Sequence, residues 1–293
     1  MKEITFAFVL AKTAGFCWGV MRAINGAKGK ERKVGERIHV LGALVHNQDA
    51  VADLEGENIH LVKNMEEARG ETLLITAHGR SPKDIVAARK IASNVLDMTC
   101  PIVQDLHKAA LNLKSEGRTV ILIGMRSRRH PEVEGLIGVL GGIVHIVETA
   151  RDIELLPLNE NERIGVVAQT TFNELEMIEF VRIIKNRFKD TNFIPTICDD
   201  ISKKQIELRE KGSNFDLIIV VGDKKSANAT HLAEIARNEL MKPTLFVLNA
   251  TELESRLIEN AKNIFVTASA STPPRSIGSV LSWLTDAGGQ LYV

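Results

Sequence analysis

Gly15-Phe16-Cys17-Trp18-Gly19-Val20 is the stretch from which the fold can be worked out. An apolar run at 4–10, typical of a buried strand, ends shortly before it, and the pattern at 20–28 predicts a helix after it. The glycines on either side of the cysteine allow the backbone to turn tightly between the two elements. A helix that begins here directs its amides and its positive dipole end toward the thiol of Cys17, which favours the thiolate.

Two further cysteines, Cys100 and Cys198, lie at similar corners later in the chain. The intervals between the three cysteines have similar lengths, and each contains strand-like runs that alternate with helical stretches. This alternation predicts right-handed βαβ connections and parallel sheets. We therefore predict an α/β protein in which three small units, at 18–99, 101–195 and 1–16 plus 197–293, surround a shared centre. The strand at 4–10 should pair with the third unit, because each cysteine closes one unit and opens the next.

Polar motifs follow the strand-like runs throughout the chain. We expect these runs at 4–10, 38–42, 72–76, 94–96, 119–124, 143–147, 163–168, 192–195, 216–221, 244–248 and 264–268. The run at 264–268 is expected to be the last strand, ahead of a C-terminal helix. In parallel sheets ligands bind beyond the carboxyl ends of the strands, so these motifs predict a site where the connecting loops gather.

Composition excludes several classes of partner. Among the 293 residues, Lys+Arg and Asp+Glu both number 37, and this balance gives no reason to expect nucleic acid or a membrane surface as a partner. No apolar run is long enough to span a bilayer, and the N-terminus lacks the order of segments found in a signal peptide. We expect a soluble, cytoplasmic protein.

The cysteine count is odd, which makes a disulfide framework a poor interpretation and leaves free, metal-binding or catalytic thiols. Structural zinc usually takes closely spaced Cys-x-x-Cys pairs, which are absent. An iron–sulfur cluster held by three thiolates would leave one iron open to a substrate. The alternative is that each cysteine is a small buried hydrophobic residue.

His46, His78 and His130 each follow a strand-like run and each neighbour a glycine, asparagine or proline. A lone histidine is usually a capping or surface residue, but three at corresponding strand ends favour a pocket that accepts an anion. Glu132 lies near the start of the helix that His130 opens. It either compensates the helix dipole or acts as a proton donor whose pKa is raised by burial.

Neutral hydrogen-bond donors occupy three more strand ends: Thr170, Thr171, Ser226, Asn228, Ser271 and Thr272. Each could simply cap a helix. Together with helix N-termini they could hold a phosphate or a diphosphate. The sequence has no Gly-x-x-x-x-Gly-Lys-Ser/Thr loop and no convincing Gly-x-Gly-x-x-Gly, so it gives little support to nucleotide binding.

A series of short motifs unites these residues, in this order: Gly-Phe-Cys17-x-Gly-Val-x-Arg-Ala, Leu-Val-His46-Asn, His78-Gly, Asp-x-Thr-Cys100-Pro, His130-Pro-Glu132-Val-x-Gly, Gln-Thr170-Thr171, Thr-Ile-Cys198, Ser226-x-Asn228 and Ala-Ser271-Thr-Pro. In composition and in order they resemble the 4-hydroxy-3-methylbut-2-enyl diphosphate reductase family over nearly the whole chain. That family reductively removes a hydroxyl from an allylic diphosphate and gives isopentenyl and dimethylallyl diphosphates, the last step of the non-mevalonate isoprenoid pathway.

The resemblance implies a trefoil of three α/β units around a [4Fe–4S] cluster held by Cys17, Cys100 and Cys198. It implies that Glu132 delivers the proton that lets water leave, with Thr170 beside it and near the substrate hydroxyl. The other residues that it places on the substrate are His46, His78, His130, Thr171, Ser226, Asn228 and Ser271. Electrons would come from a ferredoxin or a flavodoxin.

The chain departs from the family at several positions. Ser226-Ala227-Asn228-Ala229 lacks two hydroxyls of the usual Ser-Ser-Asn-Ser/Thr. After Cys198 the usual Ala-Thr-x-x-Arg-Gln becomes Asp199-Asp200-Ile201-Ser202-Lys203-Lys204-Gln205. The loop that carries Arg126, Arg128 and Arg129 is longer than usual. Three interpretations stay open: it replaces lost phosphate contacts, it docks an acidic electron carrier, or it is only a solvated basic loop. Two alternatives stay open: a paralogous reductive dehydratase that acts on another small anion, and a non-catalytic iron–sulfur redox sensor.

Overall fold

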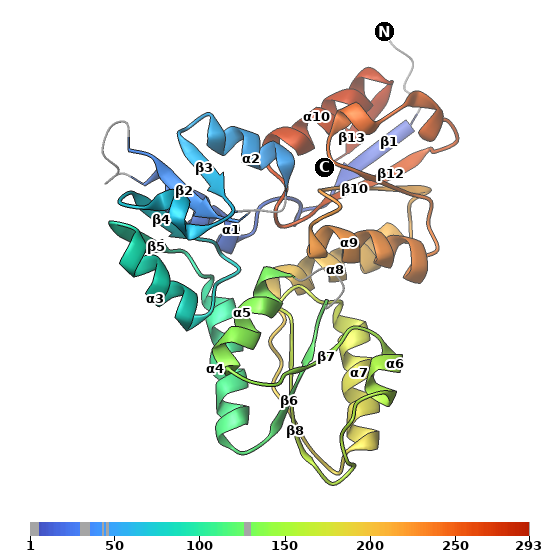
Figure 1. Cartoon of the computed structure of the whole chain (residues 1–293). Coiled ribbons are helices and arrows are strands. Elements are labelled where there is room, and N and C mark those ends of the chain that lie inside the picture. Colours follow the sequence, from blue (N-terminus) through green and yellow to red (C-terminus); the bar gives the residue numbers. More distant parts are fainter. Residues whose placement is uncertain (1–5, 30–35, 43, 45–46, 126–129, 293) are drawn as a thin grey trace. The chain divides into compact units, whose positions relative to one another are not determined.

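The computed structural model describes residues 6–29, 36–42, 44, 47–125 and 130–292 (Figure 1). The strands of this part of the chain form one five-stranded and two four-stranded sheets. Every strand pairing in them is parallel. The predicted α/β class with mainly parallel sheets is therefore confirmed. His46 and the three loop arginines lie outside the described residues.

The five-stranded sheet has the order β11-β10-β12-β1-β13. Its strands are β1 (Phe6–Leu10), β10 (Leu217–Val221), β11 (Thr244–Val247), β12 (Asn263–Ala268) and β13 (Gly289–Tyr292). The helices of this part of the chain are α2 (Gln48–Glu55), α8 (Asp199–Gly212), α9 (Ala227–Glu234) with a π-helical continuation (Ile235–Glu239), and α10 (Pro274–Asp286). Short 3₁₀ turns cover Ala250–Glu252 and Ser255–Leu257.

The two four-stranded sheets have the orders β3-β2-β4-β5 and β7-β6-β8-β9. The first contains β2 (Ile38–Leu41), β3 (Ile59–Val62), β4 (Thr72–Ile75) and β5 (Asn94–Asp97), with a 3₁₀ turn (Met65–Ala68) and α3 (Pro82–Ile91). The second contains β6 (Thr119–Ile123), β7 (His145–Val147), β8 (Arg163–Ala168) and β9 (Asp190–Phe193), with α4 (Pro101–Ser115), α5 (Pro131–Leu140), α6 (Ala150–Glu154) and α7 (Glu174–Arg187). Helix α1 (Trp18–Lys28) follows Cys17.

One strand order recurs in all three sheets. Across each four-stranded sheet, the second strand in sequence lies at one edge, and the first, third and fourth strands follow in that order. The five-stranded sheet repeats this with β11-β10-β12, and β1 takes the fourth place by pairing with β12 (Figure 1). Strand β12 lies within 197–293, where the sequence predicted a partner for the first strand. The two intervals between cysteines and the rest of the chain thus share one strand order, although the sequence shows no obvious residue-level repeat.

The core follows from the alternation of side chains along buried strands. On β10, Leu217, Ile219 and Val221 pack with apolar residues of α10, whereas Ile218 and Val220 pack with those of α8 and α9. A strand that is buried on both faces needs apolar residues at every position. This explains why all five residues of Leu217–Val221 are apolar. On β6, Ile121 and Ile123 pack against α7, and Val120 and Leu122 pack against α4 and α5.

The chain divides into two compact units, and we describe each separately. The five-stranded unit comprises Met1–Met21, Val45–Gly56 and Asp199–Val293, and the two-sheet unit comprises Arg22–Leu44 and Glu57–Cys198. The boundaries of the three α/β units that the sequence suggested stay a prediction. Two strands were missed: β3, and β13, which pairs with β1 after the strand expected to be the last. In the described part of the chain, no helix is long and apolar enough to cross a membrane.

Candidate active site

Strand register in the two-sheet unit brings Glu132 and Thr170 together. Ile123, the last residue of β6, lies opposite Ala168, the last residue of β8, so the loops that follow begin side by side. The side chain of Gln169 joins the two loops, because its Oε1 accepts the amide of Met125 at 3.0 Å. Sites in parallel sheets arise at such carboxyl ends, and this one has the site residues that the sequence placed there.

Thr170 donates two hydrogen bonds to Glu132. Its backbone amide lies 2.6 Å from Oε1 and its hydroxyl lies 2.8 Å from Oε2. Glu132 is 2% exposed, and its burial raises the pKa to about 7 although the hydrogen bonds from Thr170 act in the opposite direction. A buried carboxyl with this pKa is partly protonated at neutral pH, which is what a general acid requires.

His130 caps the helix that carries Glu132. Its Nδ1 accepts the amide of Glu132 at 3.3 Å, which fixes the imidazole at the start of α5. The ring of His78 packs edge-on against that of His130, with 5.3 Å between the ring centroids. Two of the predicted substrate histidines therefore lie together in the two-sheet unit, next to the proposed proton donor.

Glycines allow α5 to approach the loop that carries His78. A Cβ at Gly138 would lie 2.3 Å from Cβ of Ser81, so only glycine permits this contact. Gly79, directly after His78, has φ +76, a left-handed conformation that other residues rarely adopt. The Gly in His78-Gly and the glycines of α5 thus bring the two histidine loops together.

Cys100 and Cys198 each lie immediately before a helix. Cys100 is the N-cap of α4, its thiol makes no capping hydrogen bond, and its amide donates to the carbonyl of Ala77 at 3.0 Å. Cys198 precedes α8, and its amide donates to the carbonyl of Thr170 at 2.9 Å. The backbones of both cysteines are thus hydrogen-bonded to the loops that carry His78 and Thr170. Both residues are partly exposed, and neither forms a disulfide.

In the five-stranded unit, Cys17 lies at the corner between β1 and α1. Gly15 has φ +96, and the amide of Cys17 donates to the carbonyl of Ala270 at 3.2 Å. The amide of Val20 points at the sulfur of Cys17, 3.4 Å away. Helix amides directed at sulfur stabilise the thiolate, as the sequence predicted for this corner.

A buried ion network that the sequence did not reveal holds this corner. Lys204 on α8 is 3% exposed, and its ammonium donates to the carbonyls of Thr13 and, at 2.9 Å, Gly15. Burial lowers the pKa of Lys204 to about 8, although Cys17 and nearby carboxylates oppose the shift.

Glu207, also on α8, accepts the amides of Lys12 at 3.0 Å and Thr13 at 2.9 Å. Burial alone would raise its pKa, but hydrogen bonds from Lys211, Lys12 and Thr13 outweigh burial and lower the pKa to about 2. Two charged side chains of α8 therefore hold the backbone just before Cys17 in place through hydrogen bonds. The only sequence signal was the replacement of the family's arginine by Lys204.

Ser226, Asn228 and Ser271 also come together in the five-stranded unit. Val221 lies opposite Ala268, so the loops after β10 and β12 begin side by side. The hydroxyls of Ser271 and Ser226 are 3.3 Å apart, and Oδ1 of Asn228 accepts the amide of Ala270 at 2.9 Å.

The other end of the Asn228 amide is available to a ligand. Its Nδ2 is buried and has no partner among the described residues, although burying a donor without a partner is costly. Ser226 also caps α9, so the capping interpretation of this serine is correct as well. Anions bind readily at such a helix start.

Thr171 and the three cysteines complete the set of predicted site residues. The hydroxyl of Thr171 lies 3.2 Å from Nε2 of Gln169, one residue from Thr170. Cys17 belongs to the five-stranded unit, and Cys100 and Cys198 belong to the two-sheet unit. Within the described residues, no three His, Cys, Asp or Glu side chains form a group that could hold a metal ion. The assignment of the three thiols to one cluster stays a prediction.

The chain is similar to a well-defined set of known proteins. The model of the LytB protein family matches residues 8–285. The chain is 35% identical over 288 residues to the 4-hydroxy-3-methylbut-2-enyl diphosphate reductase of Aquifex aeolicus, covering 97% of this chain and 98% of that protein. It is 34% identical over 274 residues to the enzyme of the same name from Citrifermentans bemidjiense, covering 93% and 95%.

Two solved structures have similar folds. The E-1-hydroxy-2-methyl-but-2-enyl-4-diphosphate reductase of Plasmodium falciparum matches with a TM-score of 0.90 and 28% identity, over 98% of this chain and 92% of that one. A structure of (E)-4-hydroxy-3-methyl-but-2-enyl diphosphate reductase, described as the terminal enzyme of the non-mevalonate pathway, matches with a TM-score of 0.68 and 34% identity, over 96% and 100%.

Proposed function

This chain belongs to the LytB protein family, and from that membership we propose that it is a 4-hydroxy-3-methylbut-2-enyl diphosphate reductase. It removes the hydroxyl of this allylic diphosphate reductively and gives isopentenyl and dimethylallyl diphosphates. One observation carries the proposal: Glu132 is buried, bonded twice to Thr170 and has a pKa of about 7. A redox sensor needs no such acid. A cytoplasmic location stays a prediction.

The reduction takes up two electrons and two protons, and Glu132 supplies the proton that the leaving hydroxyl needs, while the other proton ends on the allyl carbon. Its protonated carboxyl donates to the substrate hydroxyl, which then leaves as water. The two hydrogen bonds from Thr170 hold the carboxyl in one orientation and stabilise the carboxylate that remains. His130, which caps α5, and His78, packed against it, bind the substrate beside this acid.

The diphosphate binds at Ser226, Asn228 and Ser271. The buried Nδ2 of Asn228 donates to a phosphate oxygen, and the two serine hydroxyls complete the set of donors. His46 belongs to the same proposed set but lies outside the described residues. Neutral donors at a helix start hold an anion without requiring a counter-charge.

The three cysteines suit a [4Fe–4S] cluster. Each lies directly before a helix and is partly exposed, and the amide of Val20 points at the sulfur of Cys17. These features favour the thiolate form that iron requires. When bound, the cluster supplies two electrons one at a time and a Lewis-acidic iron for the hydroxyl. A ferredoxin or flavodoxin is the proposed electron donor.

The altered anchoring motif favours one other candidate, a reductive dehydratase that acts on another small anion. Ala227 and Ala229 are buried, so the hydroxyls that the family has at these positions are replaced by packed methyl groups. This candidate keeps the cysteines, Glu132 and Thr170 and differs only in the anchor.

An anaerobic assay of the reconstituted protein with a chemical reductant separates the two candidates. We expect isopentenyl and dimethylallyl diphosphates as products, and we expect Glu132→Gln to slow their formation by about 100-fold or more, the usual contribution of a general acid. The matched control is Glu134→Gln, at an exposed position in the first turn of the same helix, which should retain full activity. Unreacted substrate with intact parent protein would favour the second candidate, and a fully active Glu132→Gln would remove the proton-donor role.

A further inference from the structure

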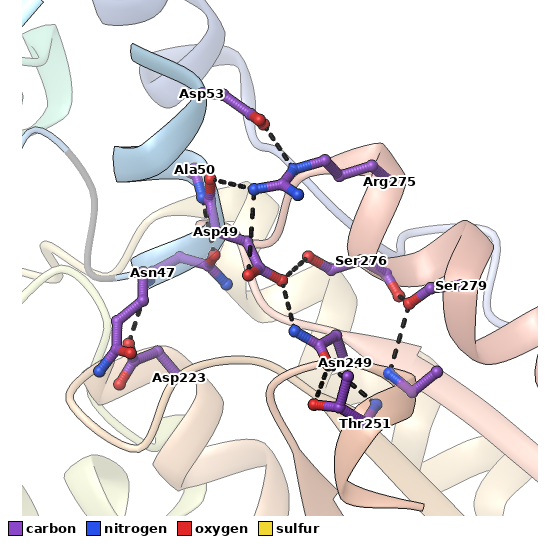
Figure 2. Close-up of polar contacts among 12 residues, drawn as sticks. Asn47, Asp49, Ala50, Asp53, Asp223, Asn249, Thr251, Arg275, Ser276 and Ser279 are labelled. Carbon is purple, nitrogen blue, oxygen red and sulfur yellow. Dashed lines mark hydrogen bonds and ion pairs between the residues drawn. The ribbon is translucent and has the colours of Figure 1, made fainter. Parts of the chain in front are cut away.

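Helix α2 packs in a part of the molecule that its place in the sequence does not suggest. The chain enters it from β2 and leaves it toward β3, both in a four-stranded sheet, but its residues belong to the five-stranded unit. Asp49 and Asp53 lie one turn apart on one face of α2, and both interact with Arg275 at the start of α10 (Figure 2). This contact joins α2 to the first turn of α10, the helix that follows the loop of Ser271.

The carboxylate of Asp49 is the centre of the contact. Its Oδ2 accepts the hydroxyl of Ser276 at 2.6 Å and the amide nitrogen of Asn249 at 2.9 Å. Arg275 donates to the backbone carbonyl of Asp49 at 2.6 Å, and its guanidinium lies 3.9 Å from Oδ1. The side chain of Asp49 is only 18% exposed, compared with 45% for Asp53, so the bonds of Asp49 are the less screened ones.

These bonds form a closed ring of three elements (Figure 2). Oδ1 of Asn249 accepts the amide and the hydroxyl of Thr251, which turns its amide nitrogen toward Asp49. Ala250, the residue after Asn249, donates its amide to the hydroxyl of Ser279, and that hydroxyl donates to the carbonyl of Ser276. The first turn of α2, the start of α10 and the turn after β11 are therefore fixed to one another.

The start of α2 also contacts the loop that leads to Ser226. The amide of Gln48 donates to Oδ2 of Asp223 at 3.3 Å, and Oδ1 of Asp223 accepts the amide of Lys225 at 2.8 Å. Lys225 directly precedes Ser226. A single helix thus contacts the loop of Ser226 at its first residue and, at its second, the first turn of α10, which directly follows the loop of Ser271.

We propose that Asp49 is a positioning residue for the diphosphate: through α2 it fixes the spacing between the loop of Ser226 and the loop of Ser271. The inference rests on the proposed function, because it concerns the anchor of that substrate. Asp49 does not touch the donors and acts through Ser276, Asn249 and Arg275. Donors that are held in place before binding need no ordering when the ligand arrives, and this raises affinity.

The proposal predicts a change in substrate affinity more than in the chemical step. Asp49→Ala leaves the buried hydroxyl of Ser276 and the amide of Asn249 without their acceptor, so the turn after β11 loses this bond to α2 and α10 keeps only the bonds of Arg275. Glu132 and Thr170 belong to the two-sheet unit and keep their own bonds. A mutation that weakens ground-state and transition-state binding equally raises KM and leaves kcat unchanged.

The test compares Asp49→Ala with two other variants in the reconstituted full-length protein. We expect about a tenfold rise both in KM for the allylic diphosphate and in Kd for inorganic diphosphate, with kcat within about twofold of the parent. Ser276→Ala, which removes one donor of the ring, should act in the same direction, and its effect should not add to that of Asp49→Ala. The matched control is Asp53→Ala, which removes an exposed contact to the same arginine and should change neither constant.

Asp49→Asn adds a conservative variant, since its carbonyl oxygen can still accept from Ser276 and Asn249. We expect it to recover part of the lost affinity. Unchanged KM and Kd in folded Asp49→Ala, or a fall in kcat alone, would overturn the proposal. If Asp49→Ala does not fold, Ser276→Ala decides by the same criteria. A parent that binds inorganic diphosphate but does not reduce the allylic diphosphate would contradict the proposed function and leave the binding comparison valid.

Discussion

Both oxygens of the Glu132 carboxylate accept hydrogen bonds from one residue, Thr170: from its amide at 2.6 Å and from its hydroxyl at 2.8 Å. This pair joins the loop after β8 to the first turn of α5, and its polar atoms are buried. Hydrogen bonds to a carboxylate favour its charged form, whereas burial favours the neutral form. Burial is the larger effect, and the pKa of Glu132 rises to about 7.

The first prediction is a dependence of rate and stability on pH. Because Glu132 must be protonated to donate, kcat should fall as pH rises above about 7. The folded state holds this proton more tightly than the unfolded state, so the free energy of unfolding should fall as pH rises from 4.5 to 7, by about 3 kcal/mol. Denaturant titrations of the parent and of Glu132→Gln measure this contribution as their difference. A difference that does not vary with pH would contradict the raised pKa.

The second prediction concerns the hydroxyl of Thr170. Thr170→Val removes one of the two bonds to the carboxylate and retains the backbone bond, so the pKa of Glu132 should rise further. The alkaline fall of kcat should therefore move to higher pH. Thr171→Val serves as the control for this shift, because the hydroxyl of Thr171 accepts a hydrogen bond from Gln169 and, among the described residues, has no such bond to Glu132. A fall of kcat that stays in place or moves to lower pH in Thr170→Val would refute the pairing.

The third prediction concerns the corner that carries Cys17. Lys204→Met leaves two buried carbonyls without their ammonium donor and should destabilise the protein by about 2–4 kcal/mol. Lys204→Arg, which restores the family's residue, should retain most of the stability. We also expect Lys204→Met to bind less iron after reconstitution, as measured by iron and sulfide content. The neighbouring exposed Lys203→Met is the control. Equal stability and iron content in all variants would show that the network does not support Cys17.

The fourth prediction concerns the close approach of α5 to the His78 loop. A methyl group at Gly138 would lie 2.3 Å from Cβ of Ser81, so Gly138→Ala should force the two apart and cost about 1–3 kcal/mol in unfolding free energy. Gly278, inside α10, has no atom within 4 Å of an added Cβ. Gly278→Ala should therefore stabilise the protein by up to about 1 kcal/mol. Thermal unfolding of both variants gives the comparison, and stabilisation by Gly138→Ala would contradict the contact.

Local pattern was sufficient to predict much of the fold. The continuous apolar runs of β6, β8 and β10 identify strands buried on both faces, and strand register then explains why Glu132 meets Thr170 and why Ser226 meets Ser271. That β1 pairs with a strand from the part of the chain after Cys198 followed from the positions of the cysteines. These features depend on near neighbours in sequence or on parallel topology.

The features that were missed depend on contacts between distant residues. β13 (Gly289–Tyr292) is short and mostly exposed, and it is a strand because β1 offers it hydrogen bonds. Lys204 and Asp49 look like ordinary charges of amphipathic helices until their partners, Gly15 and Ser276, are known. The periodicity of apolar and polar residues along the sequence gives no sign of contacts between such distant residues.

The most direct test of the central claim is a Mössbauer spectrum of the anaerobically reconstituted parent, recorded with and without the allylic diphosphate. We predict a [4Fe–4S] cluster in which one iron lacks a cysteine ligand and changes its signal when substrate binds, while the remaining iron signals stay unchanged. Single Cys→Ser variants at Cys17, Cys100 and Cys198 should each lower the cluster content. A spectrum without a cluster, or a cluster whose signals do not respond to substrate, would contradict the account.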